Sequence, residues 1–151
     1  MNKCRLGDLL TIKHGYAFKS ENYVKHSKFA LVTLANISES NNFQIDESKT
    51  TFYGADFPKE FILSDGDLVM PLTEQVVGLF GNTAFIPKFD KFSFVLNQRV
   101  GKVIPKEDKV DKYYLHYLLA TESVKEQIEY RATGTRQRNI SSDAIYDVEV
   151  Y

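Results

Sequence analysis

The sequence predicts an α+β domain in which a mostly antiparallel, curved sheet or small barrel is followed by two C-terminal helices. Three observations lead to this class. Short apolar and β-branched runs recur as far as residue 104, whereas helical spacing begins only near residue 111. Nine Tyr and eleven Phe residues supply the large rings that sheet cores favour. Strands that precede helices, with no internal repeat, are typical of an α+β fold.

The length and composition predict one self-contained domain over residues 1–151. At this size folding buries about 68–70% of the surface of the unfolded chain, so one sizeable core is expected. Cys4 is the sole cysteine, which excludes an internal disulfide and a cysteine-based zinc site and favours a reducing cytoplasm. No stretch approaches the run of about 18 apolar residues that crosses a membrane, so no membrane association is expected.

The first third of the chain predicts short elements separated by polar turns. Residues 6–12 indicate a helical turn or strand that leads into a loop at 13–15. Residues 29–34 are apolar and β-branched, which predicts a buried strand. The polar cluster at 38–42 indicates a turn, and the alternation at 43–45 indicates a brief strand.

The middle of the chain predicts the centre of the sheet. A turn is expected at residues 64–66, where Gly66 is free to take a positive φ. The apolar run at 68–72 predicts a central strand that Pro71 closes. Further strands are expected at 83–86, 92–96 and 99–104.

Two helices are predicted after this sheet, and they meet at residues 121–123. The first starts from Asp111 as N-cap, because apolar residues recur behind it at helical spacing: Tyr114, Leu115, Leu118 and Leu119. The second has capping-box spacing at Ser123 and Glu126 and an apolar face of Val124, Ile128 and Ala132, and Gly134 ends it. Residues 140–145 predict a last helical turn, and 148–150 an edge strand.

Catalytic signatures are missing from the sequence. Gly78 and Gly81 lack the lysine and the following helix of a phosphate-binding loop. The three histidines, His14, His26 and His116, do not have metal-ligand spacing. Asp65 and Asp67 flank a glycine, which fits a turn better than a catalytic pair. We therefore expect no enzyme activity, metal or cofactor in this chain.

A polar loop after the second predicted helix carries the chemistry that reads DNA. Its residues are Thr135, Arg136, Gln137, Arg138 and Asn139, directly after Gly134. Arginine can grip guanine with two hydrogen bonds, Gln and Asn can do the same with adenine, and Thr can bind phosphate. The alternative is an ordinary solvated loop behind a helix.

Three other polar segments are weaker candidates for DNA contact. They contribute Asn97, Gln98 and Arg99 between two predicted strands, Thr73 and Gln75 after Pro71, and Lys13, Tyr16 and Lys19 in an N-terminal loop. For the first segment, strand alternation would turn Gln98 away from its two neighbours. A β-bulge or a hydrogen-bonded structural asparagine explains that segment equally well.

The net charge of −1 opposes DNA binding, because affinity for the phosphate backbone normally comes from excess Lys and Arg. The distribution of charge points the other way. Three of the five arginines, Arg131, Arg136 and Arg138, fall together with no acidic residue between Glu129 and Asp143. The sequence thus predicts one locally basic stretch.

Taken together, the ordered motifs resemble a target recognition domain from the specificity subunit of a type I restriction-modification system. The resemblance spans nearly the whole chain, and its most specific part is the Gly-Thr-x-Gln-x-Asn-Ile-Ser pattern at 134–141. The other motifs are Leu-Gly-Asp-Leu at 6–9, Gly-Tyr-Ala-Phe-Lys-Ser at 15–20, Asn-Ile at 36–37, Gly-Asp-Leu-Val-Met at 66–70, the glycines at 78 and 81, Leu-Asn-Gln-Arg-Val at 96–100, and Tyr-Tyr-Leu-His-Tyr-Leu-Leu at 113–119.

This resemblance implies a role in reading double-stranded DNA. Such subunits carry two recognition domains joined by long helices, and each domain reads one half of a bipartite target. The implied partners are adenine methyltransferase (modification) subunits, a restriction subunit and a second specificity half. The family continues after a segment like 147–150 into a helical spacer, which is absent here, so a half-subunit, a truncated product or an excised domain is expected. The alternative function is a protein-interaction module that docks on modification subunits without reading DNA.

Overall fold

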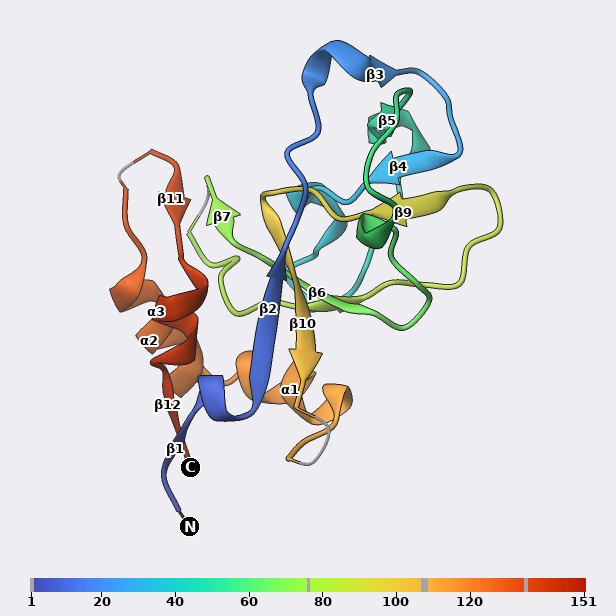
Figure 1. The fold of residues 1–151 in the computed structure, drawn as a ribbon. Helices are drawn as coiled ribbons and strands as arrows, with labels where there is room; N and C mark the ends of the chain where they lie inside the picture. Colours follow the sequence, from blue (N-terminus) through green and yellow to red (C-terminus); the bar gives the residue numbers. More distant parts are fainter. Residues whose placement is uncertain (1, 76, 107–108, 135) are drawn as a thin grey trace.

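Apolar side chains on both faces of a central four-stranded sheet build a hydrophobic core on each side of it. The computed structural model describes residues 2–75, 77–106, 109–134 and 136–151 (Figure 1). Strands β2 (Leu10–His14), β10 (Val100–Pro105), β6 (Leu68–Pro71) and β8 (Ala84–Phe85) pair antiparallel in that order. Successive side chains point to opposite faces, so Leu68 and Met70 join one core and Val69 joins the other.

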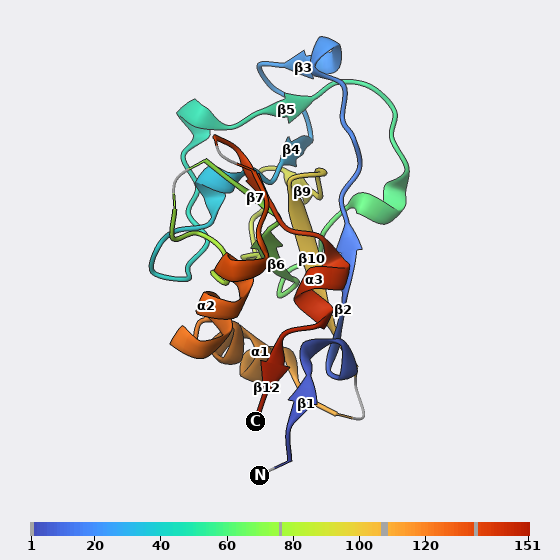
Figure 2. The ribbon, with the colours of Figure 1, turned by 90° about the vertical axis from the view of Figure 1, so that its left-hand side faces the viewer.

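Three helices cover the face of this sheet that carries Leu68 and Met70. They are α1 (Lys112–Leu119), α2 (Glu122–Arg131) and α3 (Ser142–Tyr146). The apolar stripe of each helix enters the same buried cluster as the strands, through Leu115 and Leu119, Val124 and Ile128, and Ile145. Figures 1 and 2 show these helices in the lower half of the molecule, beside both chain termini.

A second, aromatic-rich sheet forms the upper part of the molecule in both views. Its order is β3 (Tyr23–Val24), β5 (Phe52–Tyr53), β4 (Phe29–Leu31) and β9 (Ser93–Val95). Strands β4 and β9 run parallel, and the other pairs are antiparallel. Phe18, Tyr53 and Phe57 meet edge to face beneath it, an arrangement that aromatic rings favour.

Two short ladders complete the fold. Strand β1 (Cys4–Arg5) pairs with β12 (Glu149–Val150), and β7 (Thr73–Glu74) pairs with β11 (Arg138–Asn139). Single 3₁₀ turns link the strands at η1 (Leu6–Asp8), η2 (Ser20–Asn22), η3 (Leu34–Asn36), η4 (Glu47–Lys49) and η5 (Lys59–Phe61).

Most predicted elements are confirmed. The fold is mixed α+β with mostly antiparallel pairing, and β6 lies inside its sheet and ends at Pro71. The Asp111 side chain accepts a hydrogen bond from the Tyr114 amide, so this residue caps α1 as expected. The last helical turn, α3, and the final edge strand are also present. The Asp67 carboxylate accepts a hydrogen bond from the Ser64 amide at 2.8 Å, which confirms the turn predicted at residues 64–66.

Several local predictions are wrong. The strands divide between two four-stranded sheets and two ladders, since η turns and loops interrupt the chain more often than the apolar runs suggest. Lys13 and His14 belong to β2 and not to a loop, and residues 43–45 form only an isolated bridge from Phe43 to Ile37. Helix α2 ends at Arg131, because the backbone becomes extended at Ala132.

Within the described ranges, no helix combines the length and the apolar character that crossing a bilayer requires.

Candidate nucleic-acid interface

A cleft of about 460 Å³ opens between the upper sheet and the β7 segment. Five parts of the chain that are separated in sequence line it, and three of them include polar residues singled out above. These are Tyr16, Gln75 and the 97–99 segment, with Thr33, Leu34 and Ala35 of the η3 region also in the wall. Figure 1 shows the β7 and β11 tips on one side of this region and the β3 and β4 lobe on the other.

The segment around Tyr16 reaches the cleft because Gly15 permits close contact with the 96–97 backbone. A Cβ at Gly15 would lie 1.9 Å from the carbonyl oxygen of Asn97, so no other residue fits without moving the chain. The Tyr16 amide donates to the Leu96 carbonyl at 2.9 Å, and Tyr16 forms a parallel bridge with Asn97. The 15–18 and 96–99 segments therefore form one continuous wall, called the amide wall below.

Asn97 is the structural anchor of the amide wall. Its side chain is 7% exposed and donates to the Val32 carbonyl, while its Oδ1 accepts from the Arg99 amide at 2.9 Å. Gln98 and Arg99 lie in the turn that follows and are exposed. Strand alternation is thus absent here, and the structural-asparagine alternative describes Asn97. Its buried amide is not available to DNA, which corrects the prediction for this residue.

The β7–β11 ladder, which leads into the cleft-lining residue Gln75, is called the ionic wall below. Thr73 and Glu74 are buried, with Glu74 only 1% exposed. The Thr73 hydroxyl donates to Asn139 Oδ1 at 3.2 Å, and Glu74 Oε1 accepts from Arg138 Nη1 at 3.2 Å. Gln75 directly follows Glu74, is exposed and lines the cleft.

Arg138 points into the protein and not toward DNA, which corrects the prediction for this residue. Its Nη1 also donates to Glu129 Oε2, and its Nη2 donates to the Glu129 carbonyl at 2.9 Å. Two carboxylates therefore hold the guanidinium against the end of α2. Thr73 is likewise corrected, because its hydroxyl is buried against Asn139.

Residues 133–134 and 136–139 lie in a narrow hairpin tip at the position of the predicted polar loop. Thr133 and Asn139 exchange two backbone hydrogen bonds of 3.0 and 2.9 Å, and Gly134 adopts a φ of 107°, which disfavours any side chain. Arg136 and Gln137 are exposed at this tip, and so is Asn139 at its base, apart from the bond that its oxygen accepts. Thr135 lies outside the described residues.

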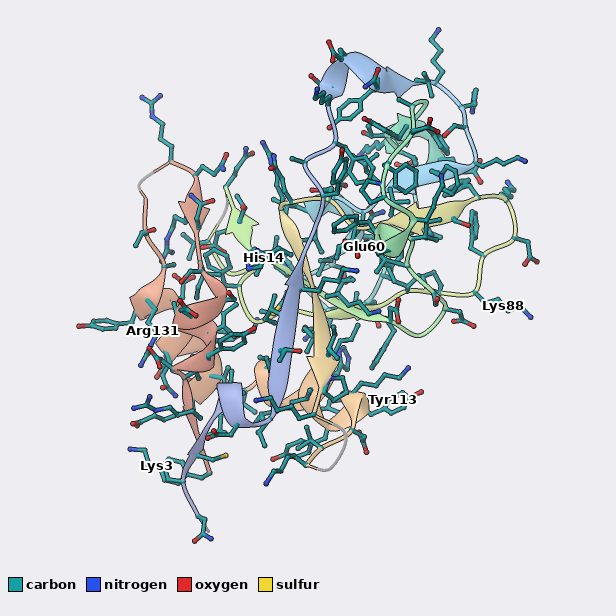
Figure 3. The ribbon with its side chains drawn as sticks, in the orientation of Figure 1. Lys3, His14, Glu60, Lys88, Tyr113 and Arg131 are labelled. Atoms are coloured by element: carbon teal, nitrogen blue, oxygen red, sulfur yellow. The ribbon has the colours of Figure 1, made fainter. Side chains whose placement is uncertain are left out.

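The basic cluster expected from the sequence is divided in space. Arg131 donates to the Gln127 carbonyl at 3.1 Å at the end of α2, and Figure 3 shows it in the lower left of the molecule, below the β11 tip. Arg138 is neutralised inside the ionic wall. Only Arg136 of the three arginines therefore presents an exposed cation at the tip.

The N-terminal candidates lie on the upper sheet side. Lys13 on β2 donates a hydrogen bond from Nζ to the Glu60 carbonyl at 2.8 Å, and the same atom lies 4.9 Å from the Phe61 ring centroid. Contacts within the protein therefore hold this side chain. Tyr16 is half-buried against Phe18 and Phe61 and faces the cleft. Lys19 is exposed at the start of η2 but does not line the cleft.

The sequence interpretation missed Glu74 as part of the site. Its carboxylate joins both loops of the ionic wall, since Oε2 accepts from the amides of Leu79 at 3.1 Å and Phe80 at 3.2 Å. The available signal was an acidic residue inside a segment that is predicted to contact DNA. A carboxylate there repels phosphate unless a cation within the protein pairs with it.

Two further observations concern the titratable and metal-ligating side chains of the described residues. Burial lowers the pKa of His116 on α1, whose Nδ1 is hydrogen-bonded to the Thr83 hydroxyl. In the described ranges, no three His, Cys, Asp or Glu residues gather closely enough to hold a metal ion. The arrangement offers amide, guanidinium and aromatic groups around a hollow, and these groups bind and orient a ligand.

Comparisons with known proteins agree on one family. The type I restriction modification DNA specificity domain matches residues 1–151. The specificity subunit of the type I restriction enzyme MjaVIII from Methanocaldococcus jannaschii is 26% identical over 148 residues, which cover 95% of this chain and 35% of that protein.

Solved structures share the fold. The type I restriction-modification S subunit from M. genitalium superposes with a TM-score of 0.61 at 17% identity, over 98% of this chain and 33% of that one. The HsdS subunit from Thermoanaerobacter tengcongensis gives a TM-score of 0.56 at 16% identity, over 98% of this chain and 32% of the other. The chain thus spans about a third of each relative. The match over residues 1–151 confirms the predicted resemblance and a specificity role in place of a catalytic one, and the chain belongs to the type I restriction modification DNA specificity domain family.

Proposed function

We propose that the cleft and the adjoining hairpin tip read one half of a bipartite double-stranded DNA target for a type I restriction-modification complex. One observation carries this proposal: three exposed polar side chains from two separate segments, Gln75 from one and Gln98 and Arg99 from the other, converge on the same cleft. Glutamine and arginine are the residues that grip adenine and guanine edges through paired hydrogen bonds in the major groove. Their convergence around one hollow supports direct reading of bases.

The exposed tip residues extend this surface. Arg136 and Gln137 follow Gly134 in a hairpin whose β11 strand pairs with β7, so they belong to the same wall as Gln75. Arg136 supplies a cation for a phosphate or a guanine, and Gln137 supplies a second carboxamide. Lys19 and Asn139 are exposed at the margins and complete the proposed contact set.

The balance of charge bears on how the domain acts. A net charge of −1 gives little general attraction to phosphates, so the domain by itself binds DNA weakly and with a shallow salt dependence. We propose that residues 1–151 act as one recognition domain beside a second specificity half. Adenine methyltransferase subunits then supply further DNA contacts, a restriction subunit joins the same complex, and the assembly works in the cytoplasm.

Selection from randomised DNA duplexes tests the proposal. The wild-type protein should enrich a short motif, and Arg99→Ala should weaken binding and relax preference at one base pair, by about 1–3 kcal/mol of discrimination. The matched control is Arg5→Ala. Arg5 is an exposed arginine on β1, in the part of the fold where the termini lie, so its loss should leave the motif unchanged.

The same experiment separates the alternative function. A protein-interaction module that docks on modification subunits without reading DNA would enrich no motif, even at low salt. In that case Arg99→Ala and Arg5→Ala would behave alike, and co-purification with modification subunits would become the informative measurement.

A further inference from the structure

Glu74 connects the two loops that border the ionic wall. Its Oε2 accepts hydrogen bonds from the amides of Leu79 and Phe80 at 3.1 and 3.2 Å, which closes the loop that follows β7. Its Oε1 accepts from Arg138 on β11 at 3.2 Å. One buried side chain therefore fixes a loop by its backbone and grips the neighbouring hairpin by its charge.

Arg138 extends the connection to helix α2. The guanidinium bonds to both the carboxylate and the backbone carbonyl of Glu129, and it lies 6.0 Å from the centroid of the Phe80 ring. Glu74, Glu129 and Arg138 thus form a cluster, called the carboxylate–arginine cluster below. It joins β7, β11 and the end of α2, which are separated by up to 64 residues in the sequence.

Such a cluster is a costly way to gain stability. Removing a carboxylate from water carries a large penalty, and apolar residues of similar volume often stabilise a protein equally well or better. What the charged groups fix is the relative position of the elements, because a planar guanidinium donates hydrogen bonds only in fixed directions. The cluster therefore defines the distance and angle between the loop at 74–80 and the hairpin at 133–139.

Both ends of the cluster are directly attached to proposed DNA-reading residues. Gln75 follows Glu74 in the sequence, and Gln137 precedes Arg138, so a shift of either anchor moves the adjacent carboxamide. A pair of hydrogen bonds to a base edge tolerates little displacement, since its strength depends on the alignment of both bonds. Misplaced readers still meet the phosphates but no longer distinguish one base from another.

We propose that Glu74 is a positioning residue for DNA discrimination, which it controls by locking the 74–80 loop to the 133–139 hairpin through Arg138. It does not itself contact DNA. This role rests on the proposed function of the cleft, but the coupling of the two loops is a property of the protein alone. The two parts are therefore measured separately.

The first measurement is amide hydrogen exchange of the protein without DNA. Glu74→Gln keeps the size of the side chain but removes its charge, and it should raise the exchange rates of Leu79 and Phe80 and of the Thr133–Asn139 pair together, by about tenfold or more. Arg138→Lys keeps the charge but lacks the fork that reaches Glu129, and it should loosen the same two segments. It also carries the test if Glu74→Gln does not fold. Glu126→Gln on the exposed face of α2 is the matched control and should change neither.

The second measurement is the ratio of affinities for the selected duplex and a scrambled duplex. Glu74→Gln should lower this ratio by about tenfold, while affinity for the scrambled duplex stays constant or rises slightly because a negative charge is lost. Glu126→Gln should preserve the ratio. An unchanged ratio in the cluster variants, or exchange confined to one of the two loops, would overturn the proposal. If the wild type enriches no motif, the proposed function itself fails and the role in discrimination fails with it, whereas the exchange data still report the coupling.

Discussion

The two walls of the cleft present similar polar groups but are held by different forces. The amide wall rests on Asn97, a neutral side chain that bonds to Val32 and to the amide of Arg99, two residues away. The ionic wall rests on Glu74 and Arg138, which are charged and join three separate elements. Asn97 joins its turn to the segment at Val32, 65 residues earlier, by neutral hydrogen bonds, whereas the ionic wall joins its three elements through charged groups. The difference predicts distinct responses to substitution.

The largest effect is expected for Arg138→Ala. Removal of the guanidinium leaves Glu74, which is 1% exposed, as a buried carboxylate without its cation, and such losses destabilise proteins by about 3–5 kcal/mol. Denaturant unfolding measures the change. Arg136→Ala is the matched control two residues away and should alter the free energy of unfolding by less than about 0.5 kcal/mol. Equal effects of the two variants would refute the ionic character of this wall.

A smaller loss is expected for Asn97→Ala in the amide wall. The variant leaves the Val32 carbonyl and the Arg99 amide without their partner, which costs about 1–3 kcal/mol. Gln98→Ala next to it should leave stability unchanged, because Gln98 is exposed. If Asn97→Ala proved as harmful as Arg138→Ala, the distinction between the two walls would disappear.

DNA binding should distinguish the charged reader Arg99 from the neutral reader Gln98 at a smaller energetic scale. Arg99→Ala should reduce the slope of log affinity against log salt by about 1, because the variant removes one positive charge from the proposed interface. Gln98→Ala should keep the slope and weaken only the preferred sequence. Titrations of labelled duplex at several salt concentrations distinguish these results, and identical slopes for wild type and Arg99→Ala would remove this arginine from the phosphate contacts.

The smallest effect concerns His116 on α1, which packs against Thr83 and Phe85 outside the ionic wall. Because burial lowers the pKa of His116 below its ordinary value of 6.5, the unfolded chain binds more protons than the folded one just below that pH. The contribution of His116 to the free energy of unfolding is therefore fully present above about pH 6.5 and is lost as the pH falls through its lowered folded-state pKa. Thermal unfolding between pH 5 and 8 should show this loss, and His116→Gln should reduce it. His26→Gln, an exposed histidine, should retain it.

The sequence was sufficient for elements that depend on local patterns. Helix α1 was located from its apolar spacing and Asp111, and β6 from an apolar run closed by Pro71, since both signals lie within a few residues. The sequence pattern predicts that helix α2 continues past Arg131, because Gly134 resembles a C-cap. Its positive φ instead serves the hairpin, a role that appears only once β11 pairs with β7.

The candidate site was only partly predictable for a physical reason. Asn97, Gln98 and Arg99 have similar polarity, and only their tertiary surroundings bury the first and expose the others. Arg138 has the chemistry of a DNA contact, but its partner Glu74 lies 64 residues earlier, beyond the reach of any local pattern. Residue type singled out Tyr16, Gln75 and the 97–99 segment, which line the cleft, but gave no signal for the 31–35 segment in the same lining.

The interleaving of buried anchors and exposed readers has a consequence for how new targets arise. Several of the proposed readers stand next to an anchor in the chain, as Gln75 follows Glu74 and Gln98 follows Asn97, yet the hydrogen bonds that Glu74 and Asn97 make involve no reader side chain. A single codon change at a proposed reader is therefore expected to alter the donors and acceptors offered to a base pair while the free energy of unfolding stays within about 0.5 kcal/mol. On the proposed function, the sequence preference of the domain changes at exposed positions and its stability at buried ones.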